Sequence, residues 1–168
     1  MRLKTLLCFL LFQALATTGA VAEIRVGSPA PKFEITSIDG ALSFSSASEK
    51  GKVILVNFWA TWCAPCKAEM PAIESYYKKH KAEGLEVIAI SMDASKDLEK
   101  VTAYARQFSF PIAHKGSANI KEFGRIWRLP STFILDRHGV LVKNGHEGDP
   151  EVTLELLESL VSPILKQQ

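Results

Sequence analysis

The sequence predicts a single α/β domain in which one β-sheet is covered by helices. Three observations support this fold class. Strand-like and helix-like segments alternate along the chain, and two strongly apolar stretches, 53–59 and 85–92, have the composition of buried strands. The 168 residues, 47% hydrophobic and 23% charged, suffice for one domain with a full core but are few for two.

The individual elements follow from local patterns. Two short alternating stretches, 33–38 and 42–44, flank Asp39-Gly40 and predict an N-terminal hairpin. A helix is expected over 64–81, bent at Pro71, and a second helix is expected to start with Ser95 as its cap. The remaining elements are a strand at 110–113, a short helix at 119–124, strands at 132–135 and 140–143 joined by a turn at 136–139, and a last helix from near Pro150.

The first 22 residues differ from the rest. Arg2 and Lys4 precede an apolar stretch at 6–16, and small residues close on Ala20-Val21-Ala22. This order predicts a cleaved signal peptide over 1–22 and a domain over 23–168. The alternative is an uncleaved anchor, the one expected contact with a membrane, although the stretch is shorter than the ~20 apolar residues that span a bilayer.

Cleavage would leave two of the three cysteines, Cys63 and Cys66, because Cys8 lies in the first segment. A disulfide between them would close a very short loop and restrict the unfolded chain little. Redox exchange therefore explains the pair better than structural cross-linking does. Loss of Arg2 and Lys4 would leave the chain formally neutral, and no basic stripe indicates a nucleic-acid partner.

Cys63 is expected at the N-terminus of the helix that begins at Ala64. Unpaired amides and the positive end of the helix dipole favour a thiolate there, and such positions lower a cysteine pKa from ~8.5 to ~3.5–7.5. Pro65 suits the first turn, where its missing N–H has no partner to lose. Cys66 lies one turn further along. We therefore expect an exposed Cys63 that attacks and a shielded Cys66 that resolves the mixed disulfide.

A zinc half-site is the alternative for an isolated Cys-x-x-Cys pair. Zinc normally takes four ligands, and the sequence has no second cysteine pair. Its four histidines are scattered without ligand spacing: His80, His114, His138 and His146. We expect neither a metal nor a cofactor.

Two segments resemble the thioredoxin superfamily, and within it the exported TlpA/ResA/DsbE (CcmG)-like branch. The first is Asn-Phe-Trp-Ala-Thr-Trp-Cys-Ala-Pro-Cys at 57–66, followed by Glu69 and Pro71; the second is 129–139, which is similar to the family's cis-proline segment. The resemblance covers the whole chain after the signal segment. It implies a thioredoxin-like fold, with a central mixed sheet flanked by helices and an N-terminal hairpin extension.

The resemblance also implies roles for particular residues. Cys63 and Cys66 would form the redox-active disulfide. Glu69, on the helix face of Cys66, would be a functional glutamate; the alternative is a solvated helix charge. Pro130 would follow a cis bond; the alternative is an ordinary proline at a strand edge. Asn57 occupies the place of a buried acid in thioredoxins proper, and an amide cannot transfer protons as that acid does.

Partner binding is expected around these groups, at Trp62, Ala64, Pro65 and Leu129. Trp59 could share in the rim or belong to the core. Arg128 departs from the family, which often has glycine two residues before the cis-proline, and with Arg125 it would make the rim basic.

The implied activity is thiol–disulfide exchange with client proteins in the periplasm of the bacterial envelope. The resemblance favours reduction, fed by a membrane electron donor of the DsbD/CcdA kind, with cytochrome c maturation or another envelope protein as client. The direction depends on a reduction potential that the sequence does not give.

Three other functions are less well supported. Peroxide reduction on this fold would need a Pro-Thr-Cys arrangement, which is absent around Cys63. An exported thioredoxin-like copper chaperone, or metal-binding protein, would favour three residues between the cysteines and a nearby histidine such as His114 or His138. A non-catalytic docking module would not need both cysteines.

Overall fold

The computed structural model describes residues 24–167. The expected signal peptide over 1–22 lies outside these described residues. Within 24–167, no helix has the length and apolar character needed to cross a membrane.

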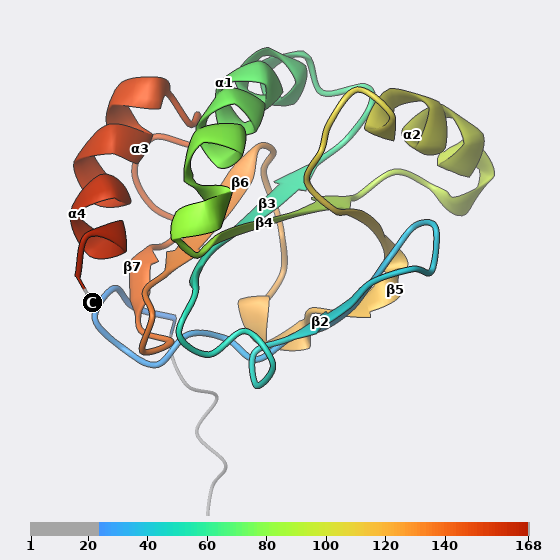
Figure 1. The fold of residues 1–168 in the computed structure, drawn as a ribbon. Coiled ribbons are helices and arrows are strands. Elements are labelled where there is room, and N and C mark those ends of the chain that lie inside the picture. Colours follow the sequence, from blue (N-terminus) through green and yellow to red (C-terminus); the bar gives the residue numbers. More distant parts are fainter. Residues whose placement is uncertain (1–23, 168) are drawn as a thin grey trace, which may run out of the picture.

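Seven strands form one mixed sheet (Figure 1). The β3–β4 and β4–β5 pairs are parallel, and the other four pairs are antiparallel. This arrangement confirms the predicted mixed sheet, and the β1–β2 pair is the predicted N-terminal hairpin. In spatial order the strands are β2 (Ser43–Ser45), β1 (Glu34–Ser37), β5 (Ile112–Asn119), β4 (Leu85–Ser91), β3 (Val53–Trp59), β6 (Ser131–Leu135) and β7 (Leu141–Lys143).

The helical elements alternate with the strands, as the sequence predicted. The α-helices are α1 (Ala64–His80), α2 (Leu98–Ala105), α3 (Leu154–Leu160) and α4 (Ser162–Leu165). Short 3₁₀ helices are η1 (Lys81–Glu83), η2 (Ser95–Asp97) and η3 (Lys121–Phe123). Helix α1 continues through Pro71.

The buried strand β3 separates two apolar clusters, because successive side chains of a strand point to opposite faces. Val53, Leu55 and Trp59 join the cluster formed with α1, α2 and α3. The intervening Ile54, Val56 and Phe58 belong to the cluster on the other face, where Phe33 and Phe123 complete the packing. Asn57 therefore occupies a position on the helix-covered face where an apolar side chain would be expected.

Three predicted boundaries were wrong. The strand expected at 110–113 runs instead from Ile112 to Asn119, because its second half pairs with β1. Ser95 begins the 3₁₀ turn η2 rather than capping a helix, and α2 starts at Leu98. The single helix expected from near Pro150 is divided into α3 and α4, and α3 begins only at Leu154, because the Thr153 side chain accepts a hydrogen bond from the Leu156 amide and so caps it.

The expected helix at 119–124 is the single turn η3, which supplies Phe123 to the core. The ring of Phe123 lies 5.4 Å from that of Phe58 and 4.9 Å from that of Phe133.

We expect Phe123→Ala to lower the free energy of unfolding by about 3–5 kcal/mol, since it leaves a cavity in a closely packed cluster. Urea unfolding measures this, with Leu42→Ala, at an exposed side chain, as the control. A Phe123→Ala variant as stable as the wild-type protein would contradict the prediction.

Candidate redox site

The site lies at one edge of the sheet, which the strand registers define. Trp59 at the end of β3 pairs with Ser91 at the end of β4, because these strands are parallel. Phe58 pairs with Ser131 at the start of β6, because that pair is antiparallel. The segments after β3 and β4 and the segment before β6 therefore leave the sheet at the same edge. These segments carry Cys63, Asp93 and Pro130.

Cys63 is the N-cap of α1 and is joined to Cys66 by a disulfide, with a Cα–Cα distance of 5.3 Å. Its Sγ accepts a hydrogen bond from the Cys66 amide at 3.3 Å. Ala64 and Pro65 lie between the cysteines in the first turn, and both are exposed. The structure thus confirms the predicted pairing and the predicted place at the helix N-terminus.

Cys63 is less accessible than the sequence suggested. It is 5% exposed and Cys66 is fully buried, so the expected order holds but the expected exposure of Cys63 does not. The physical reason is that Cys63, like Cys66, belongs to the apolar cluster on the helix-covered face of the sheet. Leu129, partly buried, packs against the same cluster.

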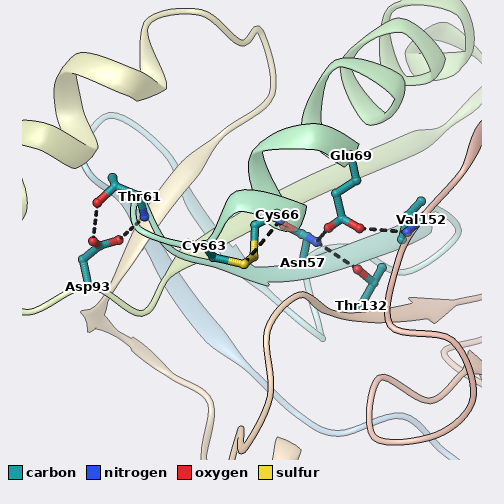
Figure 2. Close-up of a disulfide and its surroundings, with 8 residues drawn as sticks. All are labelled: Asn57, Thr61, Cys63, Cys66, Glu69, Asp93, Thr132 and Val152. Atoms are coloured by element: carbon teal, nitrogen blue, oxygen red, sulfur yellow. Dashed lines mark hydrogen bonds between the residues drawn. A yellow bond between two sulfur atoms is a disulfide. The ribbon is translucent and has the colours of Figure 1, made fainter.

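Glu69 is buried at 5% exposure, which contradicts the alternative of a solvated helix charge. Its two oxygens accept hydrogen bonds, from Asn57 Nδ2 at 2.7 Å and from the Val152 amide at 2.8 Å (Figure 2). The same Asn57 nitrogen donates to Thr132 Oγ1 at 2.9 Å. Strand β3, strand β6 and the segment before α3 thus meet around this one carboxyl group.

Burial raises the pKa of Glu69 to about 7 from an ordinary 4.5, because an ionised carboxylate loses its hydration there. The hydrogen bonds from Val152 and Asn57 oppose this rise, and so does the charge of Lys143. Burial also lowers the pKa of the Lys143 amine, which donates to the Asp149 carbonyl. At neutral pH Glu69 is therefore poised to hold or release a proton.

The Leu129–Pro130 peptide bond is cis, as the resemblance implied, and Pro130 is buried. Arg128, the departure from the family pattern, donates to the carbonyls of Gly145 and Gly148. Its guanidinium also lies 5.0 Å from the Trp127 ring. The arginine is therefore bonded to the neighbouring loop instead of being a free charge on the rim.

The three tryptophans divide between core and surface. Trp59 is fully buried, so it belongs to the core and not to the rim. Trp62 is 70% exposed and directly precedes Cys63. Trp127 is 62% exposed in the segment before the cis bond, and no motif in the sequence singled it out.

Sequence reasoning also missed the hydrogen-bonding partners of the site. Thr132 accepts a hydrogen bond from Asn57, and the Val152 amide donates one to Glu69. Asp93 accepts hydrogen bonds from Thr61, just before the cysteines (Figure 2). One available signal was the place of Asp93, two residues after a buried parallel strand, where functional side chains of α/β sheets often lie. Within 24–167, no three His, Cys, Asp or Glu side chains are grouped as metal ligands.

Comparison with known proteins gives consistent matches. Residues 26–144 match the AhpC/TSA family. The thiol-disulfide oxidoreductase ResA of Bacillus thuringiensis subsp. konkukian is 36% identical, over 93% of this chain and 87% of the relative. ResA of Oceanobacillus iheyensis is 31% identical, over 86% and 75%. A thioredoxin family thiol:disulfide interchange protein from Chlorobium tepidum TLS is 29% identical, with a TM-score of 0.69 over 86% of this chain and 99% of that one.

The fold shared with that thioredoxin family protein, together with the disulfide at a helix N-terminus, places the chain among the thioredoxin-like proteins, the class that the two sequence segments indicated. Within that class, the chain belongs to the AhpC/TSA family and is a thiol-disulfide oxidoreductase of the ResA type.

Glu69 should make stability depend on pH. Its pKa is higher in the folded chain than in the unfolded chain, so the folded state binds the proton more tightly and loses stability as pH rises from about 5 to above 7. Glu69→Gln removes the proton site, and the loss between pH 5 and 8 should shrink by roughly 3 kcal/mol. Urea unfolding of the oxidised protein measures this, with exposed Glu99→Gln as control. The same pH dependence in all three proteins would contradict the shift.

Proposed function

We propose that the chain is an exported enzyme that reduces disulfides of client proteins in the bacterial envelope. The observation that carries the proposal is the asymmetry of the cysteine pair. Cys63 caps α1 and is the more accessible residue of the pair, whereas Cys66 is fully buried one turn further along the helix. A client sulfur can approach the first cysteine and is kept from the second.

The exchange has two steps in the reducing direction. The Cys63 thiolate attacks one sulfur of the client disulfide, forms a mixed disulfide and releases the other client sulfur as a thiolate. The Cys66 thiolate then attacks Cys63 Sγ, restores the Cys63–Cys66 bond and releases the second client thiolate. Two electrons pass from the dithiol to the client, and the helix N-terminus stabilises the attacking thiolate.

Glu69 is proposed to accept the proton of the Cys66 thiol before the second step. It lies three residues after Cys66, hence on the same side of α1. Its pKa of about 7 is well matched to accepting and returning a proton near neutral pH. Asn57 and Val152 hold the carboxyl group in place by hydrogen bonds, so the proton is held at a fixed position.

Client binding is proposed at Trp62, Ala64, Pro65 and Leu129. The first three are exposed at the start of α1, and Leu129 precedes the cis bond at the same sheet edge. An extended client segment could hydrogen-bond to the Leu129 backbone as an added strand. Pro130 itself offers no N–H, hydroxyl or thiol that would react or compete there.

The cysteine roles are testable by trapping. Cys66→Ala should accumulate covalent complexes between Cys63 and clients, because nothing resolves the mixed disulfide. Cys63→Ala should accumulate few, since Cys66 is buried, and neither variant should turn over insulin disulfides. Non-reducing gels and the insulin assay measure this. Equal trapping by the two variants would overturn the assignment.

Export is a separate part of the proposal. It rests on the signal-peptide pattern over 1–22, and the domain would then comprise 23–168. Expression of the full chain in a bacterium should yield a periplasmic protein whose mass lacks residues 1–22. An intact chain in the cytoplasmic fraction would contradict export, and one in the membrane fraction would favour the uncleaved anchor.

The direction of exchange and the partners belong to the same proposal. A DsbD/CcdA-like membrane donor would keep the pair reduced, and clients would include proteins of cytochrome c maturation. The equilibrium of Cys63–Cys66 with glutathione measures the direction, because a pair that is reduced only by a strongly reducing buffer is a reductant.

A further inference from the structure

A second carboxylate, apart from Glu69, is buried beside the redox site. Asp93 is 1% exposed and follows the end of β4. It accepts three hydrogen bonds: from the Thr61 amide at 3.0 Å, from Thr61 Oγ1 at 2.6 Å and from Ser91 Oγ at 2.8 Å. Figure 2 shows it on the opposite side of the disulfide from Glu69.

Asp93 is itself fixed to the sheet. The preceding Met92 amide donates to the Trp59 carbonyl at 2.8 Å, which adds one more bond after the β3–β4 ladder. The main-chain carbonyl oxygen of Asp93 forms a hydrogen bond with Nε2 of buried His114 at 3.0 Å. Because Nδ1 of His114 accepts from the Gly116 amide, the hydrogen lies on Nε2 and the histidine is the donor to Asp93.

The turn that Asp93 holds is the one that presents the cysteines. It leads from the end of β3 to the cap of α1, and the Cys63 amide closes it by donating to the Ala60 carbonyl at 3.1 Å. Trp62, inside this turn, is 70% exposed and has little packing to define it. Thr61 directs both its amide and its hydroxyl to Asp93. The carboxylate therefore holds the backbone next to Trp62, where side-chain packing contributes little.

We infer that Asp93 is a positioning residue of this redox site, which holds Thr61 so that Cys63 Sγ is presented at a fixed place and angle. It acts through Thr61 and does not touch the reacting sulfurs. The inference rests on the proposed function in one respect, that Cys63 is the attacking thiol. Its chemistry differs from that of Glu69: Asp93 accepts hydrogen bonds to hold a backbone turn, whereas Glu69 exchanges a proton.

The test uses Thr61→Val, which removes the hydroxyl donor at nearly constant shape, and Asp93→Asn, which replaces one of two acceptor oxygens by a donor. Each should lower kcat for insulin-disulfide reduction about three- to tenfold, the effect of losing one buried hydrogen bond, with KM little changed. Thr61→Ser should retain the wild-type rate. The double variant should be no slower than the slower single one, because both changes remove the same interaction.

A second readout does not need a client protein. The oxidised and reduced forms of the Cys63–Cys66 pair are equilibrated with a glutathione redox buffer. Thr61→Val and Asp93→Asn should each raise the ratio of dithiol to disulfide by about threefold or more, because a loosened turn holds the two sulfurs together less well. Ser162→Ala is the matched control. It removes a buried hydroxyl that bonds to Tyr76, at 2.8 Å, at the far end of α1 and also donates to Glu158, and it should lower stability without changing either readout.

The outcomes separate the two proposals. Wild-type rates and equilibrium in Thr61→Val and Asp93→Asn would overturn the positioning role, as would losses equal to those of Ser162→Ala or a Thr61→Ser variant as slow as Thr61→Val. An inactive wild-type protein whose glutathione equilibrium still shifts in the two variants would overturn the proposed function and support the positioning role of Asp93. Where Asp93→Asn fails to fold, Thr61→Val alone decides the question.

Discussion

The pairing of β3 with its two neighbours is the constraint on which the site depends. Parallel pairing with β4 brings Thr61 and Asp93 to the same edge of the sheet, and antiparallel pairing with β6 brings Pro130 there as well. A shift of one residue in either register would turn every β3 side chain to the other face. Asn57 would then leave the helix-covered side, and Glu69 would lose a hydrogen-bond donor.

The two buried carboxyl groups beside the disulfide differ in what their hydrogen bonds do. Glu69 accepts two hydrogen bonds, and its desolvation outweighs them, so its pKa rises to about 7. Asp93 accepts three and is bonded to the backbone of the cysteine turn. The first arrangement suits proton transfer and the second suits rigidity. The disulfide lies between these two carboxyl groups (Figure 2).

Arg128 shows how a departure from the family pattern is accommodated. Its guanidinium bonds to Gly145 and Gly148, and Ser131 Oγ also donates to the Gly145 carbonyl. These contacts tie the segment before β6 to the loop that leads toward Val152. Since the Val152 amide donates to Glu69, the arginine helps to order the loop that completes the environment of this acid.

The sequence by itself determined the buried strands, the hairpin, the helix that begins after Cys63 and the cis-proline segment. These depend on local composition and spacing, or on motifs of consecutive residues. Only the tertiary structure decided that Glu69 is buried beside Asn57, that Thr61 bonds to Asp93 and that Trp59 and Trp62 differ in exposure. These properties depend on which distant segments exclude water from a group or meet it with a donor. Thr61 and Asp93 are 32 residues apart, and no local pattern records a contact that the sheet register creates.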